Sequence, residues 1–101
     1  MNYTELHINN PINFKSIDEL FEDIKSCNSL HLIINIGEHN FESIEVIKEL
    51  RNRLNLEKNT LNRFRKIAFL NPPGFENKSD DEDRYNFFSD KNKAVKWLEI
   101  L

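Results

Sequence analysis

Cysteine, glycine and long apolar runs are all scarce in this chain of 101 residues. Its single cysteine, Cys27, cannot form an internal disulfide, which fits a reducing compartment. Its two glycines leave no Gly-rich loop for a phosphate. No apolar run approaches the ~20 residues of a membrane span, and no basic start leads into an apolar stretch as in a signal peptide. We therefore expect a cytoplasmic location and no membrane span.

Charge is nearly balanced but unevenly distributed along the chain. Fourteen Lys and Arg face 17 Asp and Glu, a formal charge of -3 that excludes a uniformly basic nucleic-acid coat. Residues 48–66 hold seven bases and two acids, whereas residues 1–45 hold eight acids and two bases. The basic segment either meets an acidic partner or is a solvated helix face complemented by the acidic first helix. We favour the second interpretation and expect no nucleic-acid partner, since no interleaved aromatics mark a stacking platform.

Hydrophobic periodicity predicts strands that alternate with helices. The strands are expected near residues 3–8, 30–36, 66–70 and 85–88, the middle two apolar enough to be covered on both faces. Ser16 followed by Glu19 reads as a capping box that opens the first helix. Asn40 is expected to cap the second helix, and Ser89 or Asp90 the last.

Two segments do not fit this alternation. Ile12 and Phe14 indicate a short extra strand or an extended lead-in, and residues 71–84 form an acidic loop that we expect to be exposed. Alternating strands and helices favour a parallel sheet. The predicted fold is a single small α/β domain over 1–101, with a four- to five-stranded, mostly parallel sheet covered by helices.

A family resemblance enters through the C-terminal third. The strand Lys66–Leu70, the aromatic pair Phe87-Phe88 and the helix carrying Ala94-x-x-Trp97-Leu98 resemble the end of STAS-like domains of the SpoIIAA-like group, also called STAS/SEC14-like. The upstream order of helix, apolar strand, long helix and strand agrees. The likeness covers most of residues 16–101. It implies a non-catalytic regulatory or protein-interaction module, with a small-molecule or lipid-type carrier as the alternative.

The candidate site follows the central strand, where open α/β sheets tend to place ligands. Residues Glu38, His39, Asn40 and Ser43 lie there, and the next helix begins with free backbone N–H groups. An ordinary loop and cap is the competing interpretation. In anti-sigma-factor antagonists the resemblance places a phosphorylated serine at this junction. It therefore implies Ser43 as a phosphorylation site, although the Gly-Leu pattern that follows it in that group is missing.

No catalytic or metal-binding motif is present in the sequence. His7, His31 and His39 lack the spacing of a metal site, so we expect no metal and no cofactor. His31 is expected to make a core or edge hydrogen bond, and Cys27 to be a small buried apolar residue. There is no nucleophile elbow and no HExxH motif. We expect a protein that is not an enzyme, whose partner is another protein or a second copy, with a small ligand as the other option.

Overall fold

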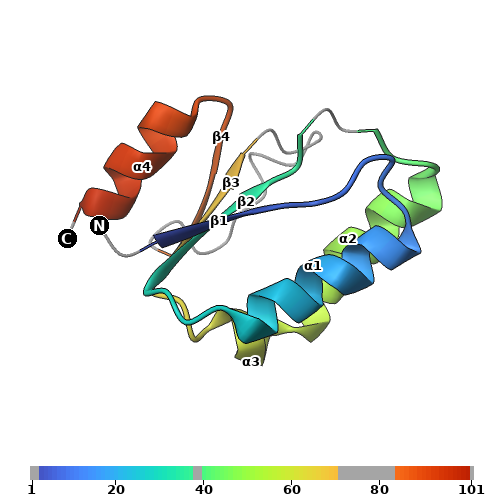
Figure 1. Cartoon of the computed structure of the whole chain (residues 1–101), viewed down its shortest axis with the longest axis horizontal. Coiled ribbons are helices and arrows are strands. Elements are labelled where there is room, and N and C mark those ends of the chain that lie inside the picture. The colour runs from blue at the N-terminus through green and yellow to red at the C-terminus, as the bar shows by residue number, and fades with distance from the viewer. Residues whose placement is uncertain (1–2, 38–39, 71–83, 101) are drawn as a thin grey trace.

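The computed structural model describes residues 3–37, 40–70 and 84–100 of the chain. Four strands and four helices follow one another in these ranges (Figure 1). They are β1 (Tyr3–His7), α1 (Phe14–Ser26), β2 (His31–Asn35), α2 (Ile44–Leu56), α3 (Lys58–Leu61), β3 (Lys66–Leu70), β4 (Tyr85–Phe88) and α4 (Lys91–Glu99). The predicted α/β class is confirmed. Residues 71–83 of the predicted acidic loop lie outside the described residues. Arg84, the last residue of that predicted loop, lies in a turn directly before β4.

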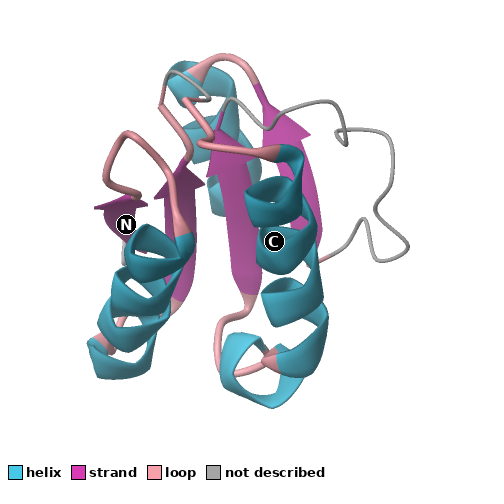
Figure 2. Ribbon diagram, turned by 90° about the vertical axis from the view of Figure 1, so that its right-hand side faces the viewer, coloured by secondary structure: helices cyan, strands magenta, loops and turns pink. Residues whose placement is uncertain are grey.

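The four strands form one fully parallel sheet in the order β1-β2-β3-β4. The two most apolar strands lie side by side as predicted, with Leu32 opposite Ile67 and Ile34 opposite Phe69. Helices that link successive parallel strands in one direction fall on one face of the sheet. In Figures 1 and 2, α1, α2 and α3 accordingly cover one face, and α4 covers the other.

Two apolar cores fill the space between the sheet and these helices. The larger core joins the inner faces of α1 and α2 to alternate residues of the strands, and it centres on Phe21, Leu32 and Ile34. The smaller core lies under α4 and contains Ile33, Ala68, Leu70, Ala94 and Leu98. Because β2 and β3 contribute to both cores, their sequences are apolar at nearly every position.

The starts of α1 and α2 differ from the predicted ones, whereas the start of α4 agrees with the prediction. The capping box on Ser16 is wrong: α1 begins three residues earlier, where the Asn13 side chain accepts the Ser16 backbone N–H at 2.9 Å. Asn40 does not cap α2, because the chain stays extended through Phe41 and reaches its N-cap at Ser43. Ile12 forms one isolated parallel bridge with Phe41 in place of a strand, and Phe14 is already helical. Asp90 caps α4, accepting from the Asn92 N–H at 2.8 Å.

In the part of the chain that is described, no helix has both the length and the apolar character that a membrane crossing requires.

Candidate functional site

The loops that leave β1 and β2 are joined beyond the ends of the strands. The Ile12 N–H donates to the Asn40 carbonyl at 2.6 Å, and the Glu42 N–H donates to the Ile12 carbonyl at 2.9 Å. The Asn10 side chain accepts the Asn40 N–H at 3.2 Å and donates to the Ile8 carbonyl at 3.3 Å. These bonds hold the described parts of the two loops against each other at the carboxyl end of the sheet.

Gly37 is required where the second of these loops leaves β2. Its φ of 74° lies in the left-handed region that side chains disfavour. A Cβ there would also lie 3.0 Å from the Asn10 amide nitrogen. The Asn35 side chain accepts the Gly37 N–H at 2.8 Å and closes the turn. A larger residue at this position would displace Asn10 and loosen the pairing of the loops.

Both long helices of the larger core start at this end of the molecule. The Asn13 side chain caps α1 and also donates to the Glu42 carboxylate at 2.9 Å, which ties the two starts together. The first helical residues, Phe14 and Ile44, are large apolar side chains that are 54% and 66% exposed. We call these residues the carboxyl-end surface, made of Asn13, Phe14, Asn40, Ser43 and Ile44.

The predicted site residues fall partly on this surface. Asn40 and Ser43 are exposed there, while Glu38 and His39 lie outside the described residues. Ser43 has extended backbone angles and makes no side-chain capping bond, so its hydroxyl faces solvent. Glu42 precedes Ser43, and Glu45 lies in the first turn of α2, where the helix dipole stabilises a carboxylate. These two carboxylates disfavour a bound anion at the start of α2.

A polar cluster on the α4 face was missed by sequence reasoning. The Glu5 carboxylate accepts from Asn35 at 3.2 Å, lies 3.1 Å from the His7 imidazole and pairs with Lys91 at 2.6 Å. Burial pushes the pKa of Glu5 upward, but the hydrogen bonds from Lys91 and Asn35 and the charges of Lys91 and His7 outweigh it. The pKa of Glu5 is therefore lowered. The hydrogen bond to Glu5 raises the pKa of Lys91.

The structure bears out the expectation for Cys27 in part, since Cys27 packs against the larger core, whereas one ring nitrogen of His31 lacks a hydrogen bond. His31 is only 7% exposed, and its Nδ1 has no hydrogen-bond partner among the described residues. Burial, followed by the charges of Lys66 and Arg65, lowers the pKa of His31. Cys27 is half-buried; burial raises the pKa of its thiol, but hydrogen bonds with Thr4 and Ser29 and the charge of Arg63 lower it overall. Within the described ranges, no three potential ligands gather into a metal site.

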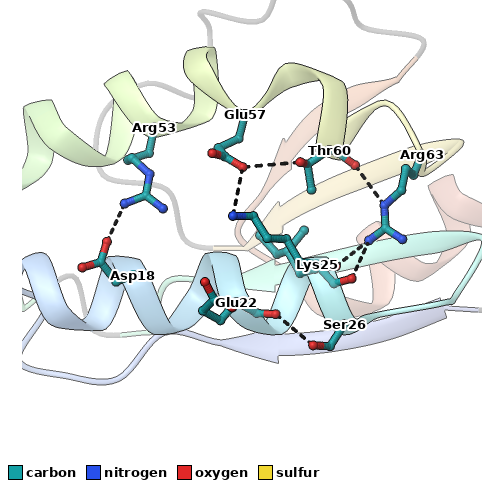
Figure 3. A network of polar contacts seen from close by, with 9 residues as sticks. Asp18, Glu22, Lys25, Ser26, Arg53, Glu57, Thr60 and Arg63 are labelled. Atoms are coloured by element: carbon teal, nitrogen blue, oxygen red, sulfur yellow. Dashed lines mark hydrogen bonds and ion pairs between the residues drawn. The ribbon is translucent and has the colours of Figure 1, made fainter.

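The basic segment is partly neutralised by α1 (Figure 3). Arg53 pairs with Asp18 at 2.5 Å and lies over the Phe21 ring at 4.8 Å. Arg63 donates to the carbonyls of Ile24 and Lys25 at 2.7 and 3.3 Å. These carbonyls lie at the C-terminal end of α1, where the helix dipole stabilises a cation. These contacts support the interpretation of the basic segment as a surface complemented by the first helix for Arg53 and Arg63, but not for Lys66, which is buried in β3.

Comparison with known proteins adds no relative to this picture. No protein-family model, no curated protein and no solved structure matches the chain.

The sequence held one signal for the polar cluster. Alternation places Glu5 and His7 on the same side of β1, but Asn35 and Lys91 join them only through the parallel register and the position of α4.

Proposed function

We propose that this chain is a non-catalytic protein-interaction module whose partner binds the carboxyl-end surface. The observation that carries the proposal is the pair of exposed apolar side chains, Phe14 and Ile44, on two helix starts tied together by Asn13 and Glu42. Large apolar groups on a fixed, polar-rimmed surface are typical of protein docking sites. The resemblance to STAS-like domains favours the same regulatory role.

Modification of Ser43 would regulate this surface. Its hydroxyl is exposed and makes no capping bond, so a phosphate there disrupts no existing contact. The added charge would stand beside Glu42 and Glu45, and the surface would become strongly acidic. We therefore expect a phosphate on Ser43 to alter partner affinity by electrostatics, without unfolding α2.

Site-specific photocrosslinking in native cells tests this proposal. A photoreactive phenylalanine analogue replaces Phe14 or Ile44, and the same analogue at Leu56 is the matched control. Leu56 is 70% exposed and lies at the opposite end of α2. The proposal expects one common partner captured from positions 14 and 44 and absent from position 56. Equal labelling from all three positions, or none, would contradict it.

Binding of the captured partner then separates the surface from the modification. We expect Ile44→Ser to weaken binding roughly tenfold, the loss of about 1.4 kcal/mol from one apolar contact. Ser43→Asp should change the affinity, while Ser43→Ala should leave it within twofold. Circular dichroism confirms that each variant keeps its helices.

The small-molecule carrier is the second candidate. The sequence supports a carrier through its aromatic side chains, which are more numerous than a minimal core requires: Phe41, Phe69, Phe75, Phe87 and Phe88. Phe69 stacks on Phe87 with centroids 5.2 Å apart, and Phe88 packs on Trp97 at 5.7 Å, while Phe75 lies outside the described residues. These contacts use the aromatic rings for packing within the fold. Native mass spectrometry of freshly purified protein tests the carrier directly, because a carrier retains its ligand.

A further inference from the structure

Strand β1 forms one edge of the sheet. Among the described residues its single pairing partner is β2. The Ile8 N–H donates to the Asn35 carbonyl at 3.2 Å, which shows that the backbone groups of Ile8 point towards β2. In a parallel ladder every second residue directs its backbone N–H and C=O groups at the neighbouring strand, so those of Thr4 and Leu6 also point towards β2. Tyr3, Glu5 and His7 therefore point their backbone N–H and C=O groups away from the sheet.

This edge is short, but it lacks several other features that block pairing with another strand. Its register with β2 runs without a bulge from Tyr3 to His7, and it contains no proline and no lysine. Its one carboxylate, Glu5, is half-buried and held by Lys91 and Asn35, and it is the charge that a second strand would have to face. Edge strands without such protection are templates for a further strand.

A second copy of this chain fits the edge in one register. Antiparallel pairing needs outward-facing residues opposite each other. One such register places Glu5 opposite Glu5 of the other copy, which is repulsive. Shifting the register towards the C-terminal end of β1 places Glu5 of each copy opposite His7 of the other. Leu6 then lies opposite Leu6 at the twofold axis, while Thr4 lies opposite Ile8, whose side chain is already buried in its own core. A carboxylate–imidazole pair on one face and contact between the two Leu6 side chains on the other favour this second register.

We propose that two copies of the chain associate through β1 in this antiparallel register, with a twofold axis at Leu6 that joins their sheets into one. The interface is separate from the carboxyl-end surface and does not depend on it. Two α1 helices would lie next to each other on one face of the joined sheet, and each carries Asp18, Glu19, Glu22 and Asp23. Repulsion between these carboxylates weakens the association, and the short strand edge adds only a small interface.

Sedimentation velocity of the full chain is the first test. We expect the average mass to rise from 12.1 kDa towards twice that value as the concentration increases from about 10 µM to about 1 mM. His7→Pro removes an outward N–H but no bond to β2, and it should abolish the rise while circular dichroism stays unchanged. Ile44→Ser, on the other surface, should leave the rise intact. A constant mass of 12.1 kDa for the unmodified chain would overturn the proposal.

Disulfide trapping in a Cys27→Ser background tests the register. In the proposed register the Leu6 Cα atoms lie roughly 4.5 Å apart as a non-hydrogen-bonded pair, which is within disulfide reach. The Thr4 Cα atoms lie roughly 13 Å apart, four residues out of register. Under oxidised glutathione, Leu6→Cys should therefore form a covalent dimer and Thr4→Cys should not. Equal trapping of both variants, or trapping of Thr4→Cys alone, would refute this register.

Discussion

The two faces of the sheet are built differently. The face under α1, α2 and α3 is mainly apolar, with Phe21, Leu32 and Ile34 fully buried. The face under α4 combines a smaller apolar core with charged and polar groups, among them Glu5, Lys66 and Lys91. Both connecting helices, α1 and α2, fall on the first face because strand order follows chain order, so within the described residues α4 is the helix that covers the second. One face depends on apolar burial, and the other also depends on specific polar contacts.

The largest expected difference between the faces is in core truncation. Phe21→Ala should lower the free energy of unfolding by about 3–5 kcal/mol, because it leaves a cavity in the larger core. Leu98→Ala in the smaller core should cost about 2–3 kcal/mol. The exposed Leu56→Ala is the control, with an expected change below ~0.5 kcal/mol. Urea unfolding followed by circular dichroism measures all three. Equal losses from Phe21→Ala and Leu98→Ala would show that the two cores contribute alike.

A smaller effect is expected from the buried lysine of the α4 face. The Lys66 ammonium donates to the Trp97 carbonyl at 2.9 Å and to the Ile100 carbonyl, and it lies 5.0 Å from the centre of the Trp97 ring. Lys66→Met keeps the aliphatic stem but leaves the last carbonyls of α4 without this donor. We expect a loss of about 1–2 kcal/mol.

Tryptophan fluorescence sharpens this second test, because Trp97 is the only tryptophan of the chain. Its emission should shift in Lys66→Met, where the cation over the ring is lost, and shift less in Lys66→Arg. An unchanged emission and an unchanged free energy of unfolding in Lys66→Met would show that the contact is energetically silent.

The smallest expected effect is the pH dependence of His31, which lies on the α4 face. Burial and the charges of Lys66 and Arg65 lower the pKa of His31 in the folded protein. The unfolded chain therefore binds a proton at a higher pH than the folded chain, and stability should fall as the pH drops through about 6.5. His31→Phe should reduce this slope between about pH 7.5 and about pH 5.5. The same slope in both proteins would assign the pH dependence to other groups.

The sequence predicted those features that depend on neighbouring residues. The apolar runs at 30–36 and 66–70 predicted two adjacent, doubly covered strands, and the structure confirms this. Features set by partners distant in the chain were missed. Ser16 and Asn13 are both residue types that cap helices. Asn13 caps α1, and its amide nitrogen also donates to the distant Glu42 carboxylate. Phe41 leaves the predicted helix because Ile12, 29 residues earlier, pairs with its backbone.

The proposed site divides along the same line. Ser43 and Asn40 were recognised from their position after a central strand, a local property of the sequence. The sequence predicts Phe14 in a short strand or extended lead-in, since apolar residues at alternating spacing usually face a core. Helical spacing likewise predicts a buried stripe of Phe41, Ile44, Ile47, Leu50 and Leu54, which is wrong for Ile44. The exposure of Phe14 and Ile44 follows from where the two helices begin, and that is decided by the pairing of the loops.

A strand order that repeats the chain order also matters during synthesis. As the chain emerges from the ribosome, each new strand finds its neighbour already made, and no early strand waits for a later one to be inserted beside it. Assembly can thus proceed from the N-terminus in single steps, and α4 arrives last to cover Lys66. A nascent chain stalled before residue 90 would carry that ammonium group with no carbonyls to receive it.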